Sequence, residues 1–256
     1  MSALFNLDNP FWRFMSKLGD MIMLTVVWLV CCIPIVTIGP ATTAMYYVML
    51  KLVRDLEGSV FKQYFKSFKE NLKQGMIIGV IMTLLGALLL FDLTFYKDAT
   101  GQIASLLWWA SLIFFIIWAM VSQYIYALLA KFVQTVKRYF MFGLFLSIRH
   151  FGYTVLMLLV SAVALIVIYF YPPFVLMAMG VVAYVNSKML VVIFDKYIPD
   201  ELKEVNQLKD PDQGFGDGPA DGKPAEEEPV HIVMDINEPT HVVLGDTSKM
   251  GNKEEK

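Results

Sequence analysis

The chain has 256 residues, of which 57% are hydrophobic and only 17% are charged, and its mean hydropathy is +0.57. Soluble domains carry about 25% charged residues, so this composition excludes an ordinary soluble protein. The formal net charge is −2, but the charges are unevenly distributed along the chain. Residues 1–194 hold fourteen Lys and Arg against seven Asp and Glu, whereas residues 195–256 hold seven against sixteen. The sequence therefore predicts a basic membrane domain followed by an acidic tail.

The first twenty residues mix aromatic side chains with Arg13 and Lys17. Aromatic and basic residues together are typical of the boundary between membrane and water, so residues 1–20 are predicted to form an interfacial N-terminal segment. The apolar run begins only at Met21, and no cleavage pattern of small residues follows it. This argues against a removed signal peptide.

A helical hairpin is predicted next. The uncharged run over residues 21–38 can cross most of a hydrocarbon core of ~30 Å at ~1.5 Å per residue. Gly39 and Pro40 interrupt the run, and a second apolar segment covers residues 41–53. The adjacent Cys31 and Cys32 point in different directions around a helix, so ordinary packing is expected of them.

The segment over residues 59–73 has a clear helical period. Apolar side chains recur on one side of the helix, at Val60, Phe61, Tyr64, Phe65, Phe68 and Leu72. Lysines recur on the other side, at Lys62, Lys66, Lys69 and Lys73. This pattern predicts a basic amphipathic helix on a membrane surface rich in anionic lipids, or a docking helix for a cytosolic partner.

Four further spans are predicted, at about 75–96, 103–130, 151–170 and 174–194. The loops with the most Lys and Arg stay in the cytoplasm. Six spans with both termini in the cytoplasm are favoured on this basis. If residues 41–53 instead stay at the surface, five spans result and the N-terminus moves outside. The tail is cytoplasmic in both arrangements.

An internal repeat favours six spans. Residues 51–53 and residues 131–133 each begin with Lys, and each leads through a basic segment into a span. Structural duplication of this kind is common in transporter folds. With so few identical residues, chance similarity between two apolar sequences explains the resemblance equally well.

The tail over residues 195–256 is rich in acidic residues, Gly, Pro and Lys. Such a segment buries too little apolar surface to offset its loss of chain entropy, so a disordered cytoplasmic tail is predicted. Two short β-like segments, His231–Met234 and His241–Leu244, are marginal as an isolated pair.

No catalytic, cofactor-binding or metal-binding residues can be named, because the chain has no metal-ligand spacing, phosphate-binding Gly loop or nucleophile elbow. Nothing favours a nucleic-acid partner, and an enzyme is not expected.

Two groups of polar residues are candidates for an intramembrane site. Asn186 and Lys188 form one, because polar groups at membrane depth are often functional. The broken turn forms the other, with Thr37, Gly39, Pro40, Thr42 and Thr43.

Three segments carry a family resemblance: LDNPFWRFMSKLGDMI, CCIPIVTIGPATTAMYYVMLKLVRDLEG and VFKQYFKSFKENLKQG. They resemble the YesL family of bacterial integral membrane proteins, a domain of unknown function (624). The similarity is specific in the TIGPATTAMYY turn and the FKSFKENLKQ helix, and it covers roughly residues 4–195. It implies a plasma-membrane protein that is often encoded beside sugar-uptake systems.

The expected function is an accessory or regulatory component linked to carbohydrate uptake or utilisation, whose partners are components of a sugar transporter. A small solute transporter and a non-catalytic membrane scaffold are the alternatives. Composition and pattern leave the substrate, the partner and the oligomeric state open.

Overall fold

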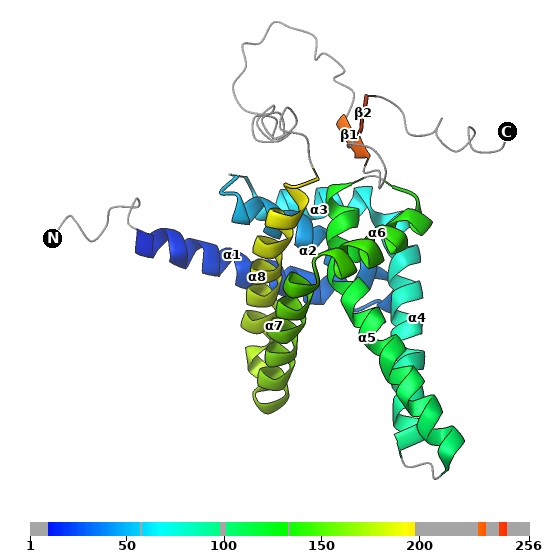
Figure 1. Cartoon of the computed structure of the whole chain (residues 1–256). Helices are drawn as coiled ribbons and strands as arrows, with labels where there is room; N and C mark the ends of the chain where they lie inside the picture. The colour runs from blue at the N-terminus through cyan, green and yellow to red at the C-terminus, as the bar shows by residue number, and fades with distance from the viewer. Residues whose placement is uncertain are drawn as a thin grey trace, which may run out of the picture.

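The computed structural model describes residues 10–56, 58–97, 101–132, 134–197, 230–233 and 241–244, with side chains between Met15 and Tyr197. The body of the chain is helical (Figure 1). Its helices are α1 (Pro10–Cys31), η2 (Ile35–Thr37), α2 (Ile38–Val53), α3 (Val60–Glu70), α4 (Leu72–Lys97), α5 (Gln102–Lys131), α6 (Val136–Arg149), α7 (Phe151–Phe170), η3 (Pro172–Phe174) and α8 (Val175–Phe194). The predicted all-α class is thus confirmed.

Five helical segments in the described part of the chain are long and apolar enough to cross a membrane. They are Ile35–Val53, Leu72–Lys97, Gln102–Lys131, Phe151–Phe170 and Pro172–Phe194. Many of their large apolar side chains are exposed, Leu84, Phe114 and Leu165 among them. A soluble protein rarely exposes apolar surface on this scale, so these helices have the surfaces of a membrane protein.

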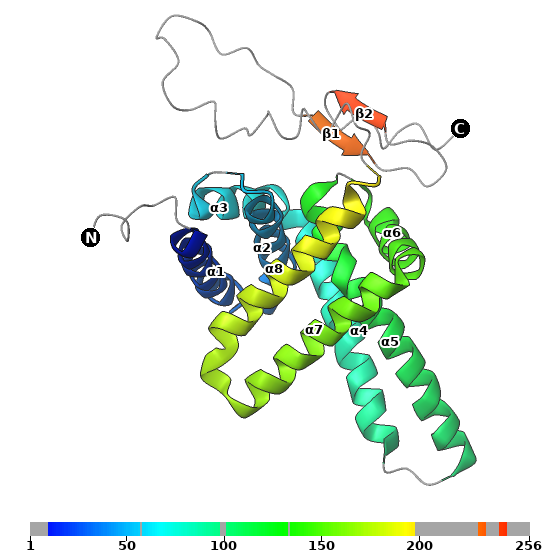
Figure 2. The same cartoon turned by 60° about the vertical axis from the view of Figure 1, so that its left-hand side comes forward.

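Two long hairpins, α4–α5 and α7–α8, extend from one end of the bundle toward the other and splay apart (Figures 1 and 2). The short helices α3 and α6 lie at the end from which these hairpins extend, which we call the surface-helix end. The opposite end holds η3, the last residues of α4 and the first residues of α5. Pro172 and Pro173 end α7 and set the turn into α8, because proline cannot continue a helix.

The first hairpin differs from the predicted pair of spans. Its first helix begins at Pro10, so residues 10–20 continue directly into the apolar run, and it ends at Cys31 before Pro34. Residues 1–9 of the predicted interfacial segment lie outside the described residues. Helix α1 lies crosswise to α7 and α8 (Figure 1).

The turn of the first hairpin does not reach the far end of the bundle. Gly39 packs on Gly75 and Gly79, which are the fourth and eighth residues of the 26-residue helix α4. The expected six-span arrangement instead places this turn at the far side of the membrane. The difference arises because three glycines allow two backbones to meet near the start of α4.

The buried core lies in the half of the bundle nearest α3 and α6. Its larger cluster centres on α5, where Tyr124, Ile125 and Leu128 are at most 1% exposed. A second cluster joins α1, α2, α3 and α8, and it includes Leu24, Met49, Tyr64 and Ala183. Helix α5, which belongs to the α4–α5 hairpin, therefore also packs against the α7–α8 hairpin.

The two predicted β-like segments pair with each other. Strand β1 (Val230–Val233) is antiparallel to β2 (His241–Leu244), with Val230 opposite Leu244. The first strand begins one residue earlier than predicted. The rest of the predicted disordered tail lies outside the described residues.

Candidate functional site

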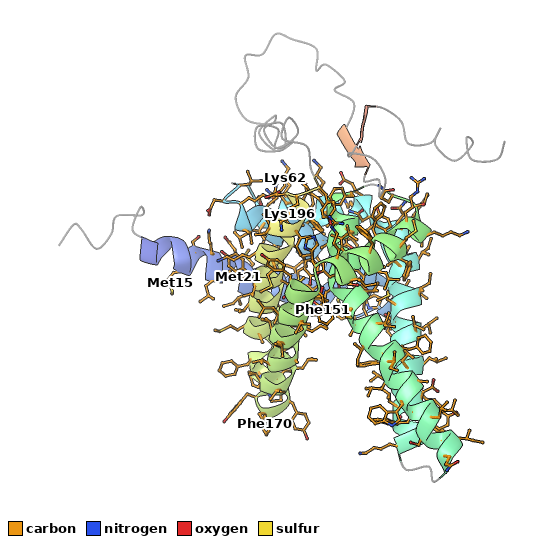
Figure 3. The ribbon with its side chains drawn as sticks, viewed as in Figure 1. Met15, Met21, Lys62, Phe151, Phe170 and Lys196 are labelled. Carbon is orange, nitrogen blue, oxygen red and sulfur yellow. The ribbon has the colours of Figure 1, made fainter. Side chains whose placement is uncertain are left out.

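The predicted amphipathic segment carries four lysines, Lys62, Lys66, Lys69 and Lys73, which we call the basic surface. Helix α3 covers Val60–Glu70 and carries three of them, whereas Lys73 is the second residue of α4. Lys66 is half-buried and the other three side chains are exposed. Figure 3 shows Lys62 at the surface-helix end of the bundle, where Lys196, two residues after α8, also lies.

Helix α3 has three faces, not the two that its sequence pattern predicts. Gln63, Tyr64 and Ser67 are buried against the bundle, and the ring of Tyr64 stacks on Phe68 at 6.2 Å between centroids. Phe61 and Phe65 are 39% and 43% exposed. At 100° per residue these two rings lie between the buried face and the lysines. An exposed apolar face beside a basic one suits a helix that lies in the interface of a bilayer.

Helix α6 is a second surface helix with its own buried tyrosine. The hydroxyl of Tyr139 donates to the carbonyl of Phe132 at 2.7 Å and accepts a hydrogen bond from the backbone N–H of Gln134 at 3.0 Å. Lys137 and Arg149 are exposed at the two ends of this helix. The surface helices α3 and α6 are thus each anchored by a buried tyrosine.

Two ion pairs join the helix ends beside the basic surface. Arg54, directly after α2, contacts Asp195, directly after α8, at 2.5 Å. Lys17 in α1 pairs with Asp55. The ends of α2 and α8 and the early part of α1 are therefore fastened together at the surface-helix end.

The broken turn is closed by its own hydrogen bonds. The hydroxyl of Thr37 donates to the carbonyls of Cys31 and Pro34, at 2.6 and 2.7 Å. The hydroxyls of Thr42 and Thr43 each donate to the carbonyl four residues earlier, at 2.7 and 2.9 Å.

The rest of the turn is equally occupied. The indole N–H of Trp28 donates to the Thr42 hydroxyl at 3.1 Å. Gly39 and Pro40 are buried against α4. The polar groups of this turn are used within the fold, which favours a structural role over solute binding.

Asn186 is the buried end of a chain of three polar side chains. Its side chain is 1% exposed, and its Nδ2 donates to Oε1 of Gln123 at 3.0 Å. Nε2 of Gln123 donates in turn to the Ser161 hydroxyl at 3.4 Å. The Oδ1 atom of Asn186 is buried and has no hydrogen-bond partner among the described residues. This polar chain links α8, α5 and α7, and its members Gln123 and Ser161 are half-buried.

The structure separates Lys188 from Asn186. Lys188 is exposed, and its ammonium group lies 4.8 Å from the centroid of the Tyr184 ring. Residues two positions apart on a helix face different ways, so the two side chains belong to different surfaces. Gln123 and Ser161 are the partners that sequence reasoning missed. Gln123 could have been noticed as an amide inside a long apolar helix.

His150 lies between α6 and α7, and its Nε2 is 3.2 Å from the hydroxyl of Tyr197. Burial lowers the pKa of His150 from its usual 6.5, and the positive charges of Lys196 and Arg149 lower it further. No three His, Cys, Asp or Glu side chains gather as metal ligands in the part of the chain that the structure describes.

A comparison with protein families finds one match. Residues 21–93 match the family described as "Protein of unknown function, DUF624". These residues include the second half of α1, the broken turn, all of α2 and α3 and most of α4. The match bears out the resemblance of this region to the domain of unknown function 624. Comparisons with curated proteins and with solved structures find no match.

Proposed function

From the similarity of residues 21–93 to that family, we propose that this protein is a non-catalytic accessory or regulatory component of a carbohydrate uptake system. The implied link to sugar uptake comes from the YesL resemblance. The basic surface would contact the partner, which is a component of the transporter. Anionic lipids would hold the surrounding helices at the membrane.

The arrangement of α3 is the observation that supports this proposal. Tyr64 is fully buried on one side of the helix, whereas Lys62 and Lys69 are exposed on another. A helix that is fixed by a buried ring presents its charges in a defined position. Defined charges favour specific recognition of an acidic partner more than a mobile loop would.

We further propose a bacterial plasma-membrane location with the surface-helix end in the cytoplasm. Charged groups support this orientation. Among the described residues, Lys97 is the only Lys or Arg at the far end of the bundle. Short segments rich in Lys and Arg remain on the cytoplasmic side. The acidic tail, which follows α8, would then be cytoplasmic as well.

Copurification from native membranes after gentle crosslinking tests the accessory function. The four lysines of the basic surface are changed together to Glu, and in a matched control they are changed together to Arg. We expect sugar-uptake components to copurify with the wild type and the Arg variant and to be lost with the Glu variant. All three proteins should be recovered in the membrane fraction with similar thermal stability.

Equal recovery of uptake components with the Glu variant would remove the basic surface from the proposal. Recovery of no such components with any of the three proteins would contradict the carbohydrate link itself.

A small solute transporter is the second candidate, and the polar chain from Asn186 to Ser161 favours it. Asn186 keeps an unpartnered acceptor inside the bundle, where a solute hydroxyl could donate to it. Flux through the purified protein in liposomes is the test. Transport that is lost in Asn186→Leu but kept in Lys188→Gln would favour this function over the accessory one, whereas no flux would exclude it.

A further inference from the structure

The first hairpin, α1–η2–α2, plays no part in the proposed function. No charged residue occurs between Met21 and Leu50. Its turn exposes large apolar side chains, with Ile33 at 77%, Ile35 at 65% and Val36 at 47%. Exposed apolar area costs about 25 cal/mol per Å² in water, so this turn fits an apolar environment.

Contacts with α4 define the depth of the turn. A Cβ atom on Gly39 would lie 1.9 Å from the carbonyl oxygen of Gly75 and 2.8 Å from the Cα of Gly79. Gly79 lies about 10 Å along α4 from Leu72, and α4 continues for about 27 Å beyond it to Lys97. The turn therefore stops well short of the level at which α4 ends.

Contacts with α8 explain how a 22-residue helix can end at this depth. Met21 and Thr25 pack on Gly180, the sixth residue of α8. From Met21, α1 continues for about 15 Å to Cys31. If α1 ran along α8 toward Val175, it would pass the end of α8, and the turn at Gly39 would lose its contact with α4. Instead α1 crosses α8, so it gains little depth (Figures 1 and 2).

The backbone of the turn is suited to hydrocarbon. The N–H of Cys32 donates to the carbonyl of Trp28 at 2.9 Å, and the N–H of Thr37 donates to the carbonyl of Pro34 at 3.0 Å. The Thr37 hydroxyl also donates to two carbonyls of the turn. Proline has no N–H, so Pro34 and Pro40 leave no donor to satisfy. Unsatisfied backbone groups cost several kcal/mol each in lipid, and these bonds avoid that cost.

We propose that α1–η2–α2 is a re-entrant hairpin that enters the bilayer from the surface-helix end, turns within the hydrocarbon and returns to the same side. Ile33, Ile35 and Val36 contact lipid acyl chains. The ion pair between Lys17 and Asp55 holds the two arms together at the side of entry. Four helices, α4, α5, α7 and α8, then cross the membrane completely.

Labelling of single cysteines tests this proposal in the full chain. Cys31 and Cys32 are first replaced by Ala, and one cysteine is then introduced by Ile35→Cys, Lys69→Cys or Gln102→Cys. The last two positions are exposed and mark the surface-helix end and the far end. A membrane-impermeant maleimide is applied to intact cells and to inverted vesicles. We expect the Lys69 and Gln102 variants to be labelled from opposite sides, and the Ile35 variant from neither side until the protein is denatured.

A spin label at the same cysteine provides a positive readout. In the Ile35 variant, collisions with dissolved oxygen should exceed those with a water-soluble nickel complex, because oxygen concentrates in hydrocarbon. Labelling of this cysteine from the Gln102 side would show that the hairpin crosses the membrane. Labelling from the Lys69 side would place the turn in water. Either result overturns the proposal, as would labelling of Lys69→Cys and Gln102→Cys from one side. Val36→Cys replaces the first variant if that protein does not accumulate.

Discussion

Gly39 is the residue on which the contact between the first hairpin and α4 depends. Its neighbours across the contact are backbone atoms of Gly75 and Gly79, which cannot move as a flexible side chain can. Small residues at spacing of four are a usual means of bringing membrane helices together. At this scale the close approach of α2 to α4 depends on the absence of a Cβ atom at Gly39.

Gly39→Ala should therefore destabilise the protein by about 1–3 kcal/mol, because the new Cβ forces α2 away from α4. Gly152→Ala in α7 is a matched control, because no atom lies within 4 Å of a Cβ at that position. It should be neutral or slightly stabilising, since Ala is a better helix former than Gly. Thermal unfolding in detergent measures both variants. Equal midpoints for the two would show that the Gly39 contact is not tightly packed.

His150 makes the stability depend on pH. The pKa of His150 in the folded protein is lowered below 6.5, the value that we assign to the unfolded chain. Between these two pKa values the unfolded chain therefore binds more protons than the folded protein does. Stability is thus present in full above pH 6.5 and falls as the pH drops below it. Between pH 7.5 and 5.5 the wild-type melting temperature should fall more than that of His150→Gln. Parallel changes in the two proteins would show that another group is responsible.

At the scale of elements, α3 and α6 illustrate two ways of burying a tyrosine. The Tyr139 hydroxyl in α6 serves two backbone groups, on Phe132 and Gln134, in the connection that precedes the helix. The Tyr64 hydroxyl in α3 is buried and has no hydrogen-bond partner among the described residues. The two rings are both buried, yet only Tyr139 fixes a loop through its hydroxyl.

Replacing each tyrosine by phenylalanine separates these roles. Tyr139→Phe leaves a buried N–H without its acceptor and should cost about 1–3 kcal/mol. Tyr64→Phe removes a hydroxyl that has no partner and should be neutral or stabilising, because the ring and its packing remain. Chemical or thermal unfolding in detergent compares the two variants directly. A larger loss for Tyr64→Phe would contradict the absence of a hydrogen-bond partner for its hydroxyl in the described part of the chain.

At the scale of the whole molecule, the distribution of charge and the shape of the bundle agree on one orientation across the membrane. One end of the bundle holds the basic surface, the ion pair of Arg54 with Asp195 and the ends of α2, α5 and α8 (Figures 1 and 3). The two splayed hairpins present apolar side chains along their length, as a lipid environment requires. The first hairpin remains within the half of the bundle that contains the core.

Reporter fusions test this polarity. A reporter on Met1 and a reporter after Lys256 should be active in the same compartment, the cytoplasm, because α1 and α8 both meet the surface-helix end. A reporter inserted after Lys97 should be active on the opposite side. Reporters on the two termini that lie in different compartments would contradict the arrangement of the first hairpin.

The four long apolar helices and the basic helix α3 follow from the chain alone, because each is specified by local signals. The apolar run and the helical period predict α4, α5, α7 and α8, and the lysine period predicts α3. Those signals act over a few residues. Hydrophobicity also shows that lipid surrounds the body, since 57% apolar residues are too many for a soluble core to bury.

Only the tertiary structure decided the depth of the first hairpin and the partners of Asn186. A residue's hydropathy indicates that it avoids water, but it does not say how far from the surface it lies. The depth is determined by where Gly39 meets Gly75, a contact between segments 36 residues apart in the numbering. Gln123 and Asn186 are 63 residues apart, and their hydrogen bond exists only because α5 and α8 pack together.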